Sequence, residues 1–389
     1  MTALRSTGIE IRPDPGRVVA RLFVPGLEVV GPSGSRAAAV VDRVLRLEED
    51  EVVGMLDELL ARFGKRHRDI ATAFNDHAEQ VVNLINPDMD MSPSRLALIG
   101  ACFTHECTPE GASACNPSMV IVDEDESGTA RFVLSLRGIG EGHLSTIGFR
   151  SGSIRPDGSV AMDEPNGFAT TAPPHPGVHY RSVFYAKLDL LTEDFTNISR
   201  LLGTLPPTFD DAALSDALAV AASDVTFHPL DTSTLFQLTE LSRASYTSHF
   251  PAETEVSERV LWPSAPIEHQ GMEDARFVRF VEDDGTVVYY ATYTAFDHLH
   301  VSIQLLRTED FIHFEMSPIA GAAAEGKGLA LFPRRVNGRY FALTRSDRES
   351  NGISSSDDLR HWPSHQSLQV PTQGWEALQL GNCGSPIEL

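Results

Sequence analysis

Positive charge is scarce in this sequence. Its 31 Lys and Arg residues stand against 54 Asp and Glu residues, which gives a formal net charge of −23 at pH 7. Such a surface repels nucleic acid and anionic membranes, so we expect neither as a partner. No stretch is apolar for long enough to span a bilayer. Met1 to Gly16 carries no apolar core of signal-peptide length, and we therefore expect a cytoplasmic protein.

Cysteine is scarce as well. The four cysteines are too few to form a disulfide framework in a chain of 389 residues. Cys102, Cys107 and Cys115 lie near His105, but their spacing matches no common zinc pattern. We expect this group to lie on a helix and its end as part of the buried core, and we predict neither a metal site nor a cofactor.

Apolar residues recur at helical spacing in the first part of the chain. A stop signal at Gly64 to Arg66 divides the pattern, and Pro93 suits the first turn of a later helix. The expected helices cover Ala37–Phe63, Ile70–Ile85, Ser92–His105, Phe195–Leu202 and Ala212–Ala221.

Short strand patterns dominate the rest, and in the C-terminal part they recur as two sets of four. The first set comprises Phe277–Phe280, Thr286–Tyr293, Val301–Leu306 and Asp310–Phe314. The second comprises Ala330–Phe332, Arg339–Thr344, Gly352–Ser355 and Asp358–Trp362. The closing segments begin 48 residues apart, and a period near 50 is typical of propeller blades. The pattern favours a β-propeller over a β-sandwich with similar hairpins.

Five strings, in order, carry a resemblance to a known family. They are Asn116–Ser118 with the strand ending at Arg137, Gly271–Phe277, Ala291–Asp297, Leu329–Arg334 with Asn337–Tyr340, and Trp375-Glu376 with Gly381–Ile387. Together they resemble glycoside hydrolase family 130, whose members are β-mannoside phosphorylases and β-1,2-mannosidases on a five-bladed β-propeller. The resemblance implies an all-β propeller over residues 111–389, with its last blade possibly incomplete, behind an N-terminal helical extension in residues 1–110.

The chain departs from the family pattern at several places. Ala275 stands where the family usually has proline. Thr344-Arg345 stands where the family's phosphorylases have a histidine-arginine pair. That histidine belongs to the phosphate site of the family, so its absence slightly favours cleavage by water over cleavage by phosphate. The chain also stops at Leu389 inside the last motif, so we expect it to lack strands that close the ring.

Glycoside cleavage needs an acid at the leaving oxygen and a nucleophile on the opposite face. Asp274 matches the family's catalytic aspartate; without that match, an ion pair with Arg276 would be the favoured interpretation. A hydrolase would also need a second carboxylate to activate water, for which Glu349 and Glu376 are candidates, although acids in loops are usually only solvated. Asp274, Glu349 and Glu376 are therefore the predicted catalytic residues.

The remaining predicted site residues are candidate sugar and phosphate ligands. Arg and Lys side chains can bind phosphate or sugar hydroxyls, although an ion pair with a nearby acid is an equal alternative for each one. The predicted phosphate ligands are Lys327, Arg334 and Arg345. The predicted substrate ligands are Asn116, Ser118, Arg137, Glu141, His143, Glu273, Arg276, Tyr293 and Asp297.

The glycine-rich segment Gly138–His143 also matches part of a dinucleotide-binding loop. That interpretation fails because a strand, not a helix, is expected to follow. The glycines would instead let the backbone approach a sugar, with a plain tight turn as an equal alternative.

The predicted function is exo-acting cleavage of β-mannosidic linkages, with inversion, by water or by inorganic phosphate as co-substrate. An oligosaccharide is the expected partner, and homo-oligomers remain open. The alternatives are a non-catalytic carbohydrate-binding propeller and an inactive truncated product.

Overall fold

The computed structural model describes residues 6–24, 35–85, 91–191, 195–224 and 226–388. The first five residues, part of the segment expected to lack a signal peptide, lie outside this range. Leu389, at which we expected the last motif to stop, lies outside it as well. None of the described helices has the length and apolar character required to cross a membrane.

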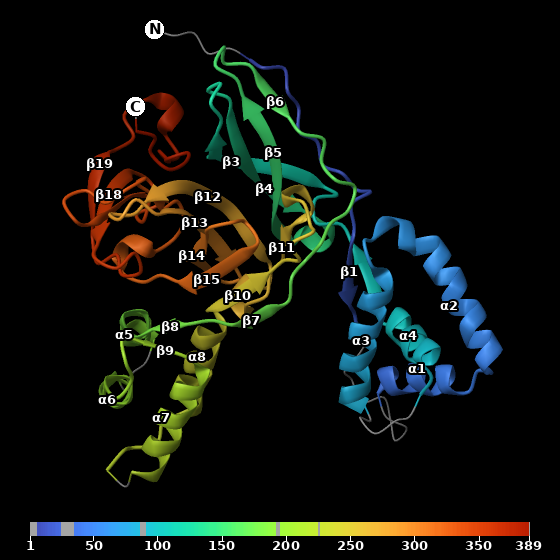
Figure 1. Ribbon diagram of the computed structural model, residues 1–389. Helices are drawn as coiled ribbons and strands as arrows, with labels where there is room; N and C mark the ends of the chain where they lie inside the picture. The colour runs from blue at the N-terminus through green and yellow to red at the C-terminus, as the bar shows by residue number, and fades with distance from the viewer. Residues whose placement is uncertain (1–5, 25–34, 86–90, 192–194, 225, 389) are drawn as a thin grey trace.

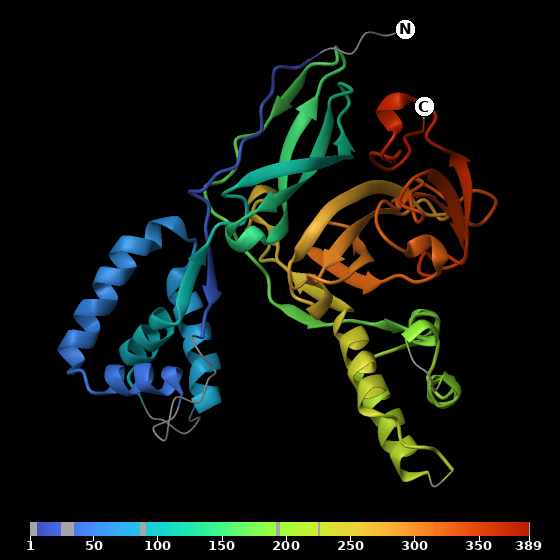
Figure 2. The same cartoon turned by 180° about the vertical axis from the view of Figure 1, so that it is seen from behind.

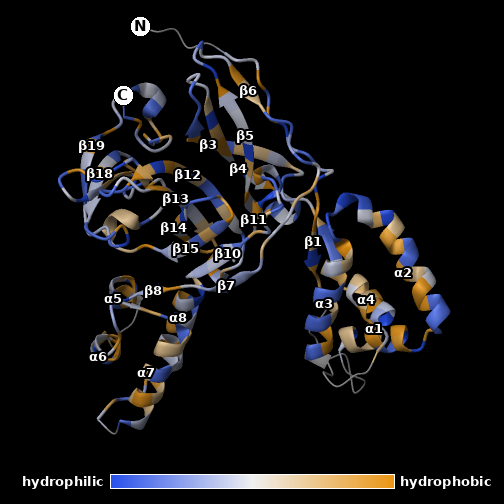
Figure 3. Ribbon diagram, viewed as in Figure 1, coloured by the Kyte–Doolittle hydropathy of each residue, from blue (hydrophilic) through white to orange (hydrophobic). Residues whose placement is uncertain are grey.

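Four helices form a separate layer near the N-terminus (Figure 1). They are α1 (Arg36–Leu45), α2 (Glu49–Phe63), α3 (Ile70–Ile85) and α4 (Pro93–Cys102), and they confirm the helical prediction. Each mixes hydrophobic and hydrophilic residues (Figure 3), and the apolar residues, including Val41, Val52 and Ile99, share one core. A Cβ on Gly100 would lie 1.7 Å from the Phe74 carbonyl oxygen, so α3 and α4 require glycine at their contact.

The prediction for the cysteine-histidine group is wrong. Helix α4 ends at Cys102, which is exposed, and the next residues form β2 (Thr104–Cys107). This strand pairs in antiparallel register with β1 (Val19–Leu22) and exposes His105. Cys107 is only partly buried beside Val19, and Cys115 lies in a later strand, so these residues do not form one buried group.

Three antiparallel four-stranded meanders make up the main body (Figure 1). The first sheet contains β3 (Ser113–Glu124), β4 (Ala130–Ile139), β5 (Ser145–Ile154) and β6 (Val160–Met162). The second contains β12 (Gly271–Val281), β13 (Val287–Phe296), β14 (Val301–Thr308) and β15 (His313–Pro318). The third contains β16 (Ala330–Leu331), β17 (Tyr340–Thr344), β18 (Asn351–Ser356) and β19 (His365–Gln369).

The 48-residue repeat has a physical counterpart in two matching turns. Asp310 accepts hydrogen bonds from two backbone N–H groups that follow it, and Asp358 does the same. Next to them, Phe311 and Leu359 both adopt positive φ, at 57° and 66°. The predicted closing strand at residues 358–362 is therefore wrong, because that segment is a turn; β19 supplies the fourth strand.

A second repeated feature is a bulge in the first strand of two sheets. The register of β3 shifts at Asn116, whose φ is 50°, and the register of β12 shifts at Asp274, whose φ is 54°. Bulges re-aim side chains and recur near functional sites. The two strands are also linked, because the Phe277 backbone N–H donates to Ser118 Oγ over 2.8 Å.

A second group of helices lies between the first two sheets in sequence and projects from the body (Figure 2). It contains α5 (Arg181–Leu191), α6 (Phe195–Gly203), α7 (Asp211–Ser223) and α8 (Thr232–Arg243) around their own apolar core. The sequence predicted α6 and α7 but neither α5 nor α8. In α5, Val183, Phe184 and Tyr185 are residue types that favour strands, and tertiary packing overrides that preference.

Short strands connect these parts. Strand β7 (Pro174–Pro176) pairs with β10 (Tyr246–His249), β8 (His179–Tyr180) with β9 (Thr208–Phe209), and β11 (Val260–Leu261) with β5. The fold is thus mostly sheet with two helical groups, and the all-β prediction accounts only for the sheets. Within the described residues the four-stranded meanders number three, and the first two are joined by one pairing between β5 and β12. The five-bladed ring therefore stays a prediction.

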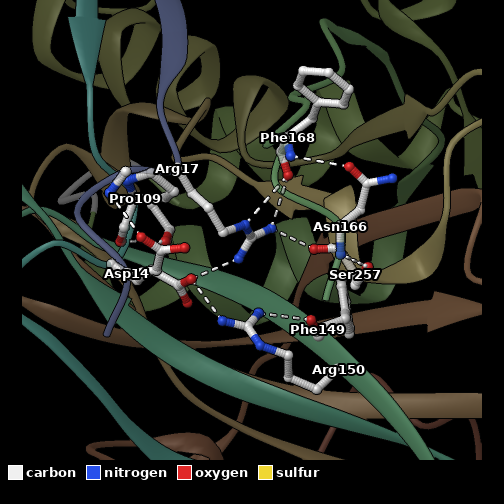
Figure 4. Close-up of polar contacts among 11 residues, drawn as sticks. Asp14, Arg17, Pro109, Phe149, Arg150, Asn166, Phe168 and Ser257 are labelled. Atoms are coloured by element: carbon white, nitrogen blue, oxygen red, sulfur yellow. Dashed lines mark hydrogen bonds and ion pairs between the residues drawn. The ribbon is translucent and has the colours of Figure 1, made fainter. Parts of the chain in front are cut away.

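A buried ionic cluster ties the N-terminal segment to the first sheet (Figure 4). Glu110 Oε1 accepts from Arg17 and from Arg150, each over 2.6 Å, and all three side chains are at most 5% exposed. Arg17 also donates to the carbonyl oxygens of Phe168 and Ser257. We call Arg17, Glu110 and Arg150 the Glu110 cluster.

Candidate active site

The bulge in β12 directs Asp274 toward a basic side chain of the first sheet. Arg137 Nη1 donates to Asp274 Oδ1 over 3.1 Å, and its Nη2 donates to Glu273 Oε1 over 2.7 Å. Lys327 Nζ reaches the other oxygen of Glu273 over 2.6 Å. We call Arg137, Glu273, Asp274 and Lys327 the Glu273 cluster; it joins four residues that the sequence predicted as site residues.

The Glu273 cluster is only partly covered. The side chains of Asp274 and Lys327 are 28% and 37% exposed, whereas that of Glu273 is 9% exposed. Glu273 therefore holds the side chains of Arg137 and Lys327 in place from the buried side of the cluster. Asp274 and Lys327 remain accessible to a ligand.

Two more cations lie beside Asp274. Burial lowers the pKa of Arg276, the positive charge of Arg345 lowers it further, and the charge of Asp274 opposes both effects. Arg276 donates to the Gly328 carbonyl oxygen and to Asn382 Oδ1, and Asn382 donates back to that carbonyl. These bonds fix a guanidinium next to a like charge, an arrangement that an anion would stabilise.

A small pocket collects these groups, since it is lined by Asp274, Arg276, Lys327 and Arg345 together with Tyr293. A larger cavity of about 630 Å³ shares Asp274 and Arg276 with it. Asn116 and Ser118 line this larger cavity. A carboxylate thus lies between a pocket rich in cations and a cavity with room for a sugar.

The structure does not bring every predicted residue into these pockets. Among the described residues, neither Glu349 nor Glu376 lines either of them. Glu349 is exposed, and Glu376 accepts from the backbone N–H groups of Thr372 and Gln373, which lower its pKa.

Other predicted residues take part in local structure. Arg334 lines the larger cavity but pairs with Glu388, at 2.7 Å. Glu141 accepts from Thr108, and Asp297 accepts from the two backbone N–H groups of its own turn. His143 is exposed and has a φ of 61°.

Sequence reasoning missed a buried carboxylate behind the small pocket. Glu268 is fully buried and accepts from the hydroxyl groups of Tyr293, over 2.5 Å, and Tyr246, over 2.9 Å. Burial raises its pKa, while hydrogen bonds from Ala265, Ser264 and both tyrosines oppose the shift. No sequence signal marks Glu268. Asn382, in contrast, lies inside a quoted motif and could have been chosen.

Potential metal ligands are dispersed. Across the described ranges, no group of three or more His, Cys, Asp or Glu residues is arranged to hold a metal ion.

The site combines an acid, several cations and a cavity of about 630 Å³. Residues 233–388 match a family model described as beta-1,4-mannooligosaccharide phosphorylase. This part of the chain is therefore similar to the mannoside phosphorylases of glycoside hydrolase family 130.

Individual relatives are similar over limited regions. A 1,2-beta-oligomannan phosphorylase from Thermoanaerobacter sp. is 32% identical over 125 residues, which are 31% of this chain and 40% of the relative. A beta-1,2-mannobiose phosphorylase from Listeria innocua is 29% identical over 133 residues, 33% of this chain and 35% of the relative. The chain thus spans two fifths or less of the length of these relatives.

Among solved structures, the Listeria innocua beta-1,2-mannobiose phosphorylase in complex with beta-1,2-mannobiose aligns with a TM-score of 0.33 and 21% identity. The alignment covers 71% of this chain and 65% of that one.

Proposed function

We propose that this chain cleaves β-mannosidic bonds with inorganic phosphate, with Asp274 as the proton donor. One observation carries the proposal: a single pocket is lined by a carboxylate and three cations, Arg276, Lys327 and Arg345. Three basic side chains suit a phosphate dianion, and they are gathered in a chain whose net charge is −23.

In the proposed reaction, Asp274 gives its proton to the leaving glycosidic oxygen, directly or through a sugar hydroxyl. The bond between this oxygen and the anomeric carbon breaks. A phosphate oxygen attacks that carbon from the opposite face, so a β-mannoside yields α-mannose 1-phosphate with inversion. Arg276, Lys327 and Arg345 orient the phosphate and offset its charge.

Hydrolysis is the second candidate, and Thr344 favours it. Its hydroxyl adds no charge where the family's phosphorylases have histidine; it is 1% exposed and has no hydrogen-bond partner within the described part of the chain. A hydrolase would require a carboxylate to activate water. The positions of Glu349 and Glu376 outside both pockets are the reason to prefer phosphate.

We further propose that the three sheets are blades of a propeller, whose five-bladed form is that of the family. The repeated Asp310 and Asp358 turns and the repeated bulges at Asn116 and Asp274 support this arrangement. A propeller would bring the first strands of its blades together around one central site.

Incubation of manno-oligosaccharides with and without phosphate tests the function. Phosphorolysis predicts mannose 1-phosphate that appears only with phosphate. If free mannose forms at equal rates with and without phosphate, the enzyme is a hydrolase and the proposed phosphorolysis is wrong. Saturable binding without any product would favour a non-catalytic carbohydrate-binding protein.

A further inference from the structure

A second cavity, of about 610 Å³, lies where α8, β7 and residues 262–269 meet. It shares no lining residue with the two pockets that contain Asp274. Its volume is within the range of small-molecule sites, roughly 300–1,000 Å³. The proposed reaction at Asp274 makes no use of it.

The wall of this cavity is held in place by a buried carboxylate. Glu268, which is 0% exposed, accepts from the backbone N–H groups of Ser264 and Ala265, over 2.8 and 3.0 Å. It also accepts from the Tyr246 hydroxyl. Ser264, Ala265 and Tyr246 all line the cavity, so this wall of the cavity is fixed by the protein core.

One polar group at the cavity is left unused by the fold. Ser245 lines the cavity and is 3% exposed, and its hydroxyl has no hydrogen-bond partner among the described residues. A buried hydroxyl without a partner is unfavourable, typically by about 1–3 kcal/mol. A ligand hydroxyl that reached Ser245 would remove this cost.

The lining indicates the chemistry of the ligand. Trp262 and several prolines supply apolar surface. The Arg21 guanidinium lies 5.0 Å from the Trp262 ring centroid, so a sugar ring could stack only on the part of the indole that lines the cavity. Asp211 and Arg243 contribute one charge of each sign, so the cavity attracts neither anions nor cations. His175 and His269 add exposed hydrogen-bonding groups. This combination suits an uncharged ligand with apolar faces and many hydroxyl groups.

We propose that this cavity is a second oligosaccharide-binding site, separate from the site at Asp274. The proposal rests on the chemistry of the cavity and not on the proposed reaction, so either can fail without the other. The site would hold a saccharide chain on the enzyme without cleaving it.

Tryptophan fluorescence can test the proposal because the signal of Trp262 can be distinguished from those of the other two tryptophans. Trp362 is fully buried, and Trp375 is 81% exposed and can be replaced by Phe. Mannotriose titrated into the Trp375→Phe protein without phosphate should change the emission saturably. Cellotriose tests whether mannose is required, and inorganic phosphate should have no effect. The change should persist when Asp274→Asn is added.

The decisive variant is Arg243→Ala with His269→Ala, which changes two exposed cavity residues. We expect at least a tenfold weaker fluorescence response, with cleavage at Asp274 retained. Arg62→Ala with His228→Ala removes the same residue types from exposed positions elsewhere and should change neither. No emission change at millimolar saccharide, or an unchanged affinity in the Arg243 and His269 variant, would overturn the proposal.

Discussion

Glu110 and Glu273 each bind two basic side chains, but the two clusters differ in burial. Arg17 and Arg150 are 2% and 5% exposed around Glu110, whereas Arg137 and Lys327 are 20% and 37% exposed around Glu273. In the Glu110 cluster, further guanidinium N–H groups donate to backbone carbonyl oxygens (Figure 4). In the Glu273 cluster, Asp274 and Lys327 face a pocket.

The same ionic chemistry therefore has two uses. A closed cluster with every group paired fixes chain segments that are far apart in sequence, but it has no capacity for a ligand. A partly open cluster holds the chain segments together less firmly, but its charged groups can contact a substrate. The four predictions that follow test this distinction, from the largest expected effect to the smallest.

The largest effect should follow Asp274→Asn in the open cluster. Removing the proton donor should lower turnover on manno-oligosaccharides by roughly 10²–10⁴-fold, the usual contribution of general acid catalysis. Binding should survive, because the amide has the size of the carboxyl group. A substrate whose leaving group needs no proton should lose less. Rates on both substrates and the melting temperature should be measured together.

A purely structural Asp274 would give the opposite result. The melting temperature would then fall, and both substrates would lose the same factor. Near-normal turnover on manno-oligosaccharides would end the assignment of Asp274 as proton donor.

In the closed cluster, Glu110→Gln should mainly affect stability. The change leaves Arg17 and Arg150 buried without a counter-charge, which typically costs about 3–5 kcal/mol in free energy of unfolding. Urea denaturation measures this loss. Glu273→Gln is the matched control, because water can reach Arg137 and Lys327; we expect a loss of about 1 kcal/mol or less. Equal losses in the two variants would contradict the distinction.

A third test asks whether the open cluster binds phosphate. At phosphate concentrations about 100 times Kd, the wild-type protein should gain about 2.7 kcal/mol of stability. Lys327→Ala should weaken phosphate binding about tenfold, which is about 1.4 kcal/mol. Thermal unfolding with and without phosphate measures both. Lys65→Ala, on a short helical turn far along the sequence, should respond as the wild type does. A full phosphate effect in Lys327→Ala would remove this residue from the site.

The smallest effect concerns the pH dependence of Glu268. It is buried like Glu110, but the groups that donate to it are the hydroxyls of Tyr246 and Tyr293 and the backbone N–H groups of Ser264 and Ala265, not basic side chains. Burial raises its pKa above the ordinary value of 4.5. Below that value the carboxyl is protonated in the folded and unfolded chains, and its stabilising contribution is fully present. As pH rises, the unfolded chain loses the proton first, so stability is lost until the pH passes the folded-state pKa.

Glu268→Gln cannot ionise, so its free energy of unfolding should fall less than that of the wild type as pH rises above 4.5. Urea denaturation across this range measures the difference. Parallel curves for the two proteins would show that Glu268 does not titrate differently in the folded state.

Local patterns were enough to predict much of the fold. The apolar spacing of α3 matched its observed limits, Ile70–Ile85, because an amphipathic helix is defined by neighbours within a few residues. The turns at Asp310 and Asp358 were found as a repeat, although both segments were interpreted as strands; in the first, only His313 and Phe314 lie in a strand. The second turn depends on a positive φ at Leu359, and the residue types around Leu359 do not indicate such a conformation.

The candidate site was predicted in part, for a related reason. Asp274 and Arg276 came from a motif and Lys327 from the set of basic residues, and the structure brings them together. Glu376 also lies in a quoted motif, but its carboxylate caps a short helical turn instead of facing a pocket.

The sequence by itself determined the acidic character, the two kinds of secondary structure and the repeat of strands, since each depends on composition or on nearby residues. Only the tertiary structure decided which charges are closed off and which face a pocket. Glu110 and Glu273 have the same side chain and similar partners, and only the surrounding sheets and loops exclude water from one and admit it to the other. Burial is a sum over contacts between distant segments, so a linear pattern of residues does not contain it.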